Sequence, residues 1–318
     1  MAEDLSKNTN AGVSSSPRIL ILGAAGQLGV ELQRRFATTS SITAAIRAVD
    51  RSAGDLANPD QIRTLIRDVK PEVILNAAAY TAVDRAESEP ELAHAINAVG
   101  PRILAEEALR LNALLVHYST DYVFDGSKSD AWTETDPTNP LNVYGASKLA
   151  GEHAIQSVGG RFLIFRTSWV YGAHGKNFLL TMLRLGRERD RLSVVDDQFG
   201  APTTSIELAR ATQEIVRGIL ANRFGAAEDY AGLYHMTCAG ATSWFGFAQA
   251  IFVRASVVLG AKMPELTPIP ATSYPTPAAR PRNSILSNEK LRSRFGVELA
   301  PWQSALDAAM AQLKLNSA

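Results

Sequence analysis

The strongest constraint on the fold is a short apolar run that leads directly into closely spaced glycines near the start of the chain. Residues 18–22 read Arg-Ile-Leu-Ile-Leu, and Gly23, Gly26 and Gly29 follow. Such a run is typical of a strand buried on both faces, and residues 30–36 have the apolar spacing of a helix. This order favours a dinucleotide site, because the backbone can approach a pyrophosphate at the positively polarised helix N-terminus. A plain strand-to-helix turn is the alternative.

Strands and helices alternate through the first half of the chain. Further strands are predicted to end near Val49 and to span Glu72–Asn76, Ala113–Tyr118 and Arg161–Thr167. Helices are predicted over Pro59–Val69, Glu89–Leu111 and Tyr144–Ser157. This alternation indicates right-handed βαβ units. We expect an α/β fold: a Rossmann-type doubly wound parallel sheet with a smaller C-terminal substrate-binding domain.

The alternation weakens beyond Trp169. Prolines crowd Pro264–Pro281, which excludes a helix or a central strand, so we expect an ordered loop on the substrate side. Terminal helices are predicted near Asn288–Phe295 and Trp302–Leu315. The predicted domains are a disordered extension at 1–17, an NAD(P)-binding domain at 18–168 with part of 204–232 returning to it, and a mainly substrate-binding domain at 169–318.

The charge balance and the single cysteine exclude several classes of partner. Lys+Arg and Asp+Glu both total 32, so net charge gives no reason to expect nucleic acid or an anionic membrane as a partner. Cys238 is the one cysteine, which excludes an intrachain disulfide and a thiolate zinc site. No run has the roughly 18 apolar residues of a membrane helix, and the polar start lacks the apolar core of a signal peptide. We expect a cytoplasmic protein that acts on a small molecule.

Polar residues after the second strand are candidates for the adenosine end of a cofactor. Asp50 lies at the distance from the glycines, about twenty residues, where an acid binds the ribose 2′-hydroxyl of NADH. Arg47 and Arg51 flank it and could receive the 2′-phosphate of NADPH. Asp55 and Leu56 could line the adenine pocket. An ordinary turn residue is the alternative reading of Asp50.

The third strand ends in small residues, Asn76-Ala77-Ala78-Ala79, followed by Tyr80 and Thr81. Ligands of open α/β sheets bind outside the carboxyl ends of the strands, and small side chains there let a ring or a ribose lie close. Close packing of a helix on the strand is the alternative.

Tyr144 and Lys148 are the candidate catalytic pair. At i and i+4 on a helix they share one face. A phenol has a pKa near 10, and a nearby ammonium is expected to lower it and make the tyrosine a general acid or base. Thr120, at the end of the preceding strand, could bind a substrate carbonyl beside Tyr144, and Asp121 could bind a sugar hydroxyl. Arg280 and Arg282 either clamp a substrate diphosphate or are exposed loop arginines.

These residues together resemble the dTDP-4-dehydrorhamnose reductase family of extended short-chain dehydrogenases. The spacing G-x-x-G-x-x-G is that of short-chain dehydrogenases, and the likeness covers Arg18 to the C-terminus. It rests on several longer runs, namely Asn76–Glu89, His117–Phe124, Pro140–Gly145, Phe165–Tyr171, Asp197–Thr203, Tyr274–Pro277, Arg280–Pro281 and Asn283–Ser284.

The resemblance implies NAD(P)H-dependent reduction of the C4 ketone of dTDP-4-dehydro-L-rhamnose, in dTDP-rhamnose biosynthesis for cell-surface polysaccharide. Tyr144 would donate the proton, with Thr120 and Lys148 in support. The resemblance implies cofactor contacts from Gly26, Gln27, Leu28, Ala79, Tyr80 and Thr81. The positions discussed above add Gly23, Gly29, Asp50, Asp55, Leu56, Tyr144 and Lys148 to the predicted cofactor contacts. The resemblance implies substrate contacts from Thr120, Asp121 and Trp169, with the indole packing on an apolar face of the sugar. Val83, Asn177 and Arg280 are further predicted substrate contacts.

One departure concerns metal. Some members of the family hold Mg²⁺ at a dimer interface through glutamates, but an ungapped comparison places Ile206 at one such position, next to Glu207. We therefore predict no bound metal, and a homodimer is allowed but not required.

Two other functions stay open. One is another nucleotide-sugar reductase or epimerase of the same family. A dehydratase of that family would need a second acid after the threonine for the elimination, but Thr120-Asp121 is followed by Tyr122 here. The other is a non-catalytic protein like the regulatory subunit of methionine adenosyltransferase, against which the intact Thr120, Tyr144 and Lys148 argue.

Overall fold

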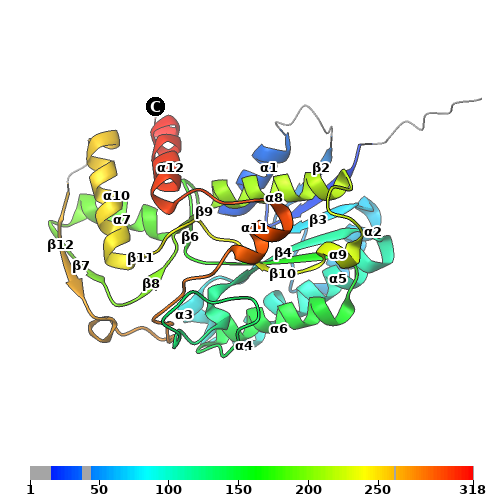
Figure 1. The fold of residues 1–318 in the computed structure, drawn as a ribbon, viewed down its shortest axis with the longest axis horizontal. Coiled ribbons are helices and arrows are strands. Elements are labelled where there is room, and N and C mark those ends of the chain that lie inside the picture. Colours follow the sequence, from blue (N-terminus) through cyan, green and yellow to red (C-terminus); the bar gives the residue numbers. More distant parts are fainter. Residues whose placement is uncertain (1–15, 38–43, 261–262, 318) are drawn as a thin grey trace, which may run out of the picture.

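A six-stranded parallel sheet forms the centre of the larger part of the molecule, in the order β10-β5-β4-β3-β1-β2. The computed structural model describes residues 16–37, 44–260 and 263–317, so residues 1–15 of the predicted disordered extension lie outside it. The strands are β1 (Arg18–Leu22), β2 (Ala45–Val49), β3 (Val73–Asn76), β4 (Leu114–Thr120), β5 (Phe162–Thr167) and β10 (Gly232–His235). Figure 1 shows them side by side between layers of helices.

Helices cover both faces of this sheet. Because successive side chains of each strand point to opposite sides, every strand contributes buried side chains to both faces. Ile19 and Ile21 pack with helices on one face, whereas Leu20 and Leu22 pack with helices on the other. The first face is covered by α1 (Gln27–Ala37) and α8 (Ser205–Leu220), and the second by α2 (Pro59–Val69), α5 (Gly100–Leu111) and α6 (Val143–Val158). The predicted α/β, doubly wound parallel fold is confirmed.

The predicted helix over Glu89–Leu111 differs from the structure in its middle. The chain forms α4 (Pro90–His94), then a π-helical turn at Ala95–Val99, and then α5. Pro101 has no backbone N–H and cannot continue the regular hydrogen-bond pattern into the preceding turn, which favours a wider turn just before it. Short helices flank this region, α3 (Val83–Ala86) before it and a 3₁₀ turn at Asp121–Val123 after β4.

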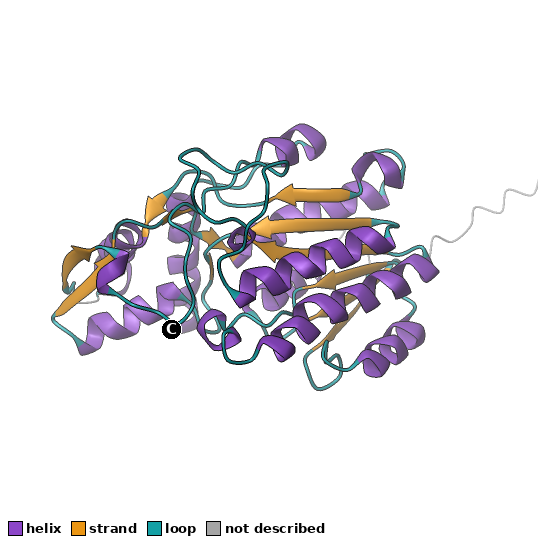
Figure 2. Cartoon of the chain, turned by 90° about the horizontal axis from the view of Figure 1, so that it is seen from below, coloured by secondary structure: helices purple, strands orange, loops and turns teal. Residues whose placement is uncertain are grey.

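The second half of the chain builds a smaller lobe and also returns to the sheet. The lobe contains β6 (Val170–Tyr171), α7 (Phe178–Glu188), β7 (Arg191–Val195), β8 (Phe199–Gly200), β9 (Thr203–Thr204), β11 (Thr242–Ser243), α10 (Trp244–Leu259), β12 (Glu265–Ile269) and α12 (Trp302–Ser317). α9 (Ala227–Tyr230) leads to β10 at the sheet edge, and α11 (Glu289–Phe295) packs beside β10. Figure 2 shows the two parts with loops gathered between them.

The proline-rich segment 264–281 is not the uninterrupted loop that we predicted. Residues 265–269 form β12, which pairs in parallel with β7 in a separate two-stranded sheet. Pro268 is tolerated because an edge strand needs hydrogen bonds on one side only. A 3₁₀ turn at Ala271–Ser273 follows, and the loop after it reaches α3 and the start of α6. In the described part of the chain, no helix is long and apolar enough to cross a membrane.

Candidate active site

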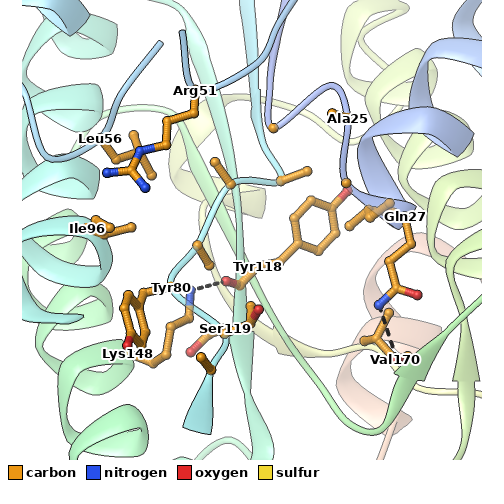
Figure 3. A pocket seen from close by; sticks show the side chains of 18 of the residues that line it. Ala25, Gln27, Arg51, Leu56, Tyr80, Ile96, Tyr118, Ser119, Lys148 and Val170 are labelled. Atoms are coloured by element: carbon orange, nitrogen blue, oxygen red, sulfur yellow. Dashed lines mark hydrogen bonds between the residues drawn. The ribbon is translucent and has the colours of Figure 1, made fainter. Parts of the chain in front are cut away.

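A cleft of about 540 Å³ opens at the carboxyl ends of β1, β3, β4 and β5. Figure 3 shows residues from the glycine turn, the loop after β2, the loop after β3, and α6 facing one another across it. The predicted cofactor residues that line this cleft are Gly23, Gly26, Gln27, Leu28, Asp50, Asp55, Leu56, Ala79, Tyr80, Thr81, Tyr144 and Lys148. They come from segments far apart in the chain, so the fold brings one elongated site together.

The glycine turn allows a close approach that larger residues would block. Gly23 has φ +79°, and a Cβ there would lie 2.8 Å from the Ala78 nitrogen. A Cβ at Gly29 would lie 2.1 Å from the Gly23 oxygen. Gly29 therefore does not line the cleft but lets α1 start directly against the turn. The turn, the bare backbone and the helix N-terminus fit the pyrophosphate of a dinucleotide.

Asp50, in the loop after β2, lines the cleft and is held in place by its neighbours. Its Oδ1 accepts hydrogen bonds from the Ser52 backbone N–H (2.9 Å) and from the Ser52 hydroxyl (2.6 Å). These bonds lower the pKa of Asp50, so the carboxylate is charged at neutral pH. Arg51 lies beside it and pairs with Asp55 at 3.2 Å. Arg47 and Asp50 together line a neighbouring hollow.

The loop after β3 is fixed by a residue that sequence reasoning missed. Asn97, fully buried in the π-helical turn, accepts from the Tyr80 N–H (2.8 Å) and donates to the Tyr80 carbonyl (3.0 Å). It also donates to Ser147 Oγ on α6 at 2.9 Å. Asn97 thus ties the loop after β3 to the helix that carries Tyr144. The only sequence signal was the Gly100-Pro101 pair, which disturbs the helix at this point.

Tyr144 lies in the first turn of α6. The N-cap is Asn142, whose Oδ1 accepts from the Gly145 N–H at 2.7 Å and whose Nδ2 donates to the Ala279 carbonyl at 2.7 Å. Burial raises the pKa of Tyr144 to about 12, and a hydrogen bond with Thr120 opposes this rise. The expectation that Lys148 lowers the pKa of this phenol below its ordinary value is therefore wrong for this structure. The tyrosine is a protonated acid at neutral pH.

Lys148 faces the cleft, but its hydrogen bonds go to residues other than Tyr144. Its Nζ donates to the Tyr118 carbonyl at 2.6 Å and lies 3.2 Å from His117 Nε2. Figure 3 shows the first of these bonds. Burial lowers the pKa of Lys148 to about 8, and Glu152, one turn further along α6, acts in the opposite direction.

None of the predicted substrate residues is among those that line the cleft, and three of them, Val83, Thr120 and Asp121, lie on elements that pack near the start of α6. Thr120 Oγ1 donates to Asp121 Oδ1 at 3.0 Å. Burial raises the pKa of Asp121 to about 7, because the carboxylate loses its hydration. Val83 is the first residue of α3, which the segment 276–280 reaches. These groups belong to different elements that meet where β4 ends.

Trp169 has an unusual backbone conformation, with φ +48°. Its indole stacks on Trp244 with 3.5 Å between ring centroids and 7° between planes. Gly200 is also in contact, because a Cβ there would lie 2.5 Å from Trp169 Cε2. One face of the indole is therefore covered by a second aromatic ring from α10, a partner that the sequence did not indicate.

Asn177 and Arg280, two of the predicted substrate ligands, both have hydrogen-bond partners within the protein. The Asn177 Nδ2 donates to the Gly172 carbonyl (2.9 Å), the His174 carbonyl (3.0 Å) and Gln27 Oε1 (3.1 Å), and its Oδ1 caps α7. Its polar atoms are used within the protein, where they position Gln27. Arg280 is not an exposed loop arginine: it makes a two-bond ion pair with Asp84 (2.8 and 2.9 Å). A diphosphate would have to compete with that carboxylate.

No group of three or more His, Cys, Asp or Glu side chains that could hold a metal ion occurs among the described residues. Glu207, the neighbour of Ile206, accepts hydrogen bonds from Arg210 Nη2 (3.0 Å) and from the Ala300 N–H (2.9 Å). Its carboxylate thus joins α8 to the segment before α12.

Comparison with known proteins gives a consistent result. The family model described as RmlD substrate binding domain matches residues 17–315. Proteins named dTDP-4-dehydrorhamnose reductase are 47% identical in Burkholderia thailandensis and 44% in Escherichia coli K12, over 93% and 94% of this chain and 99% of each relative. The crystal structure of dTDP-4-dehydrorhamnose reductase from Bacillus anthracis in complex with NADP is 35% identical, with a TM-score of 0.84 over 93% of this chain and 99% of that one.

Proposed function

The chain belongs to the dTDP-4-dehydrorhamnose reductase family and is an NAD(P)H-dependent oxidoreductase, and we propose that it uses Tyr144 to protonate O4 while the C4 ketone of dTDP-4-dehydro-L-rhamnose is reduced to dTDP-L-rhamnose. The observation that supports these roles is the position of Tyr144 and Lys148 at one end of a cleft whose other end is formed by the glycine turn and Asp50.

In this mechanism a bound NADPH or NADH supplies the hydride. Tyr144 gives its proton to the sugar oxygen as negative charge develops there, and the Thr120 hydroxyl, turned away from Asp121 Oδ1, donates a second hydrogen bond to the same oxygen. Asp121 binds a sugar hydroxyl, Trp169 packs its uncovered surface on an apolar part of the sugar, and Val83 borders the sugar from α3. Arg280, released from Asp84, binds the diphosphate.

The direct test is oxidation of NADPH measured against a panel of dTDP-4-keto-6-deoxy sugars, with product identified by mass spectrometry. The proposal expects one equivalent of NADPH consumed for each equivalent of dTDP-L-rhamnose formed. An epimerase would convert its substrate without net oxidation of the cofactor, and a regulatory protein would bind the cofactor without turnover. Either result would reject the proposed reaction.

Both reduced cofactors are expected to work, because opposite charges meet at the adenosine end. The charged Asp50 repels a 2′-phosphate, whereas Arg47 and Arg51 attract it. We expect the kcat/KM values for NADPH and NADH to differ by less than about tenfold, or ~1.4 kcal/mol. Asp50→Asn should shift the ratio toward NADPH by removing the repulsion. Activity with one cofactor alone would contradict this prediction.

Catalysis and assembly are expected to need no Mg²⁺. Mg²⁺ prefers octahedral oxygen ligation, and Ile206 has no side-chain oxygen. The carboxylate of Glu207 is engaged by Arg210 and the Ala300 N–H. Dialysis against EDTA should leave turnover and the sedimentation coefficient unchanged. Activity that is lost on chelation and restored by Mg²⁺, or a dimer that dissociates on chelation, would contradict this.

The same proposal includes the domain division and the setting of the enzyme. Residues 18–168, with part of 204–232, bind the cofactor, and residues 169–318 mainly bind the sugar nucleotide. Neither nucleic acid nor a membrane is a partner in this proposal. We propose a cytoplasmic enzyme with a role in cell-surface polysaccharide synthesis. The sedimentation measurement above distinguishes a monomer from a homodimer.

A further inference from the structure

The segment 276–280 lies against the start of the helix that carries Tyr144. It follows the 3₁₀ turn at Ala271–Ser273 and ends with Arg280, the proposed diphosphate ligand. Its central residue, Ala278, is fully buried, although the segment forms neither helix nor strand. Side chains from other parts of the chain therefore hold this segment, and they determine where Arg280 stands relative to the catalytic tyrosine.

Asn142, the N-cap of α6, is the side chain that joins the segment to this helix. Its Nδ2 donates to the Ala279 carbonyl at 2.7 Å, across 137 positions of the sequence. Its Oδ1 accepts from the Gly145 N–H at 2.7 Å, which caps the helix. Asn142 is 6% exposed, so water has little access to either bond. One amide group thus connects the segment to the helical turn that contains Tyr144.

The short helix α3 supplies the other contacts. Asp84 Oδ1 accepts from the Ala278 N–H at 3.2 Å, and the two Asp84 oxygens accept from Arg280 at 2.9 and 2.8 Å. Glu87, which follows α3, accepts from the Val143 N–H at 2.9 Å. α3, the segment and the first turn of α6 are therefore linked to one another in pairs.

The first turn of α6 is also fixed on a side that the segment does not contact. A Cβ at Gly145 would lie 2.1 Å from the Tyr122 oxygen, so the helix backbone is packed directly against the 3₁₀ turn after β4. The Tyr144 ring meets the Tyr122 ring edge to face, with 5.9 Å between centroids. If the bond from Asn142 were lost, the segment would move relative to Tyr144 rather than carry the tyrosine with it.

The bond from Asn142 is suited to persist when substrate binds. In the proposed function Arg280 leaves Asp84 for the diphosphate, which breaks the ion pair on the segment. The Ala279 carbonyl still needs a donor, and a phosphate, which has only acceptor oxygens when ionised, cannot replace the Asn142 amide. The Ala278 N–H likewise keeps Asp84 as its acceptor.

We propose that Asn142 is a positioning residue that holds the segment 276–280, and with it Arg280, at a fixed place relative to Tyr144. The inference rests on the proposed function and deepens it, because one side chain then sets the distance between the diphosphate ligand and the proton donor. A sugar nucleotide held at its diphosphate presents its C4 oxygen to Tyr144 only if that distance is correct, and misplacement of reacting groups is costly in rate.

Two substitutions separate the bond to Ala279 from the helix cap. Asn142→Ser keeps an N-cap oxygen of equal quality, but the serine side chain is too short to replace the amide donor. Asn142→Asp also keeps the cap, and a carboxylate has no donor for a carbonyl. Its charge would repel a diphosphate, so Asn142→Asp is used only in measurements without ligand. Protection of the Gly145 amide reports that the cap is intact in each variant.

Amide hydrogen exchange of the ligand-free protein tests the structural part of the proposal. In both variants the Ala278 amide should exchange roughly three- to tenfold faster, the range for net loss of one hydrogen bond, while the Gly145 amide keeps its wild-type rate. Asn58→Ser is the matched control. Asn58 is the exposed N-cap of α2, it does not line the cleft, and its substitution should alter neither amide nor turnover.

Steady-state kinetics and calorimetry test the functional part. Asn142→Ser should lower kcat/KM for the keto-sugar by about tenfold and weaken binding of dTDP, while the dissociation constant of NADPH stays unchanged. A double-mutant cycle with Arg280→Gln identifies the route of the effect. Once Arg280 is replaced, Asn142→Ser should lower kcat/KM little further, because the segment no longer carries a diphosphate ligand.

Three results would overturn the proposal. These are wild-type exchange of the Ala278 amide in both variants, wild-type kcat/KM and dTDP affinity in Asn142→Ser, and effects of Asn142→Ser and Arg280→Gln that simply add. Failure of the proposed function gives a different result, since a wild-type protein that neither binds dTDP nor reduces the keto-sugar would reject the reaction. The exchange measurement needs no ligand and would still decide whether Asn142 holds the segment.

Discussion

Tyr144→Phe is expected to lower kcat by roughly 10²–10⁴-fold, the range for loss of a general acid. The substitution removes only the hydroxyl, and the ring can keep its edge-to-face contact with Tyr122, whose centroid lies 5.9 Å away. Because burial raises the pKa of Tyr144 to about 12, the wild-type phenol is protonated well above neutral pH and available as a donor. Turnover of the keto-sugar, measured by NADPH oxidation, checks the effect.

The dissociation constant for NADPH should change little in this variant, as measured by fluorescence or calorimetry. Tyr122→Phe is the matched control, because it removes a hydroxyl from the neighbouring ring that has no role in the proposed mechanism, and it should lose less than about tenfold. A Tyr144→Phe protein with wild-type kcat would show that another group donates the proton.

Glu152→Gln is expected to reduce the free energy of unfolding by about 3–5 kcal/mol, the range for breaking a buried ion pair from one side. Glu152 and Arg166 are 1% and 4% exposed, and Arg166 donates to both Glu152 oxygens at 2.6–3.2 Å. Arg166 Nη1 has no partner in the described part of the chain. A neutral amide would leave the guanidinium buried without a counter-charge. Urea unfolding curves with unchanged m-values give the measurement.

Two further variants check the cause. Replacement of both partners by Met removes the unpaired charge and should recover most of the lost stability. Glu188→Gln, in the exposed Arg184–Glu188 pair, should change stability by less than about 1 kcal/mol. Equal losses for Glu152→Gln and Glu188→Gln would mean that burial of the pair has no energetic consequence.

Local features made much of the site predictable from the sequence. Gly23, Gly26 and Gly29 are needed by a turn whose strand and helix are adjacent in the chain. Tyr144 and Lys148 share a face because α6 forms over them, and helical spacing alone decides that. The apolar spacing also determined the order of the strands and helices in the first half, because the spacing of the residues that each element buries distinguishes a helix from a strand.

Other features required partners that are distant in the sequence. Asn97 holds the Tyr80 loop across seventeen positions, and Trp169 stacks on a ring from α10. Asp84 pairs with Arg280 across 196 positions of the sequence. A residue pattern shows that such side chains exist but not which of them meet.

The pKa values show most clearly the difference between what the sequence determined and what the tertiary structure decided. Sequence spacing by itself determined that a phenol and a lysine lie on one helix face, and it predicted that the lysine would lower the pKa of the phenol. The tertiary structure decided otherwise, because it buries Tyr144 and directs Lys148 toward the Tyr118 carbonyl and His117. Ionisation depends on hydration and on the nearest donors and acceptors, which come from β3, β4 and α6 together and exist only once the chain has folded.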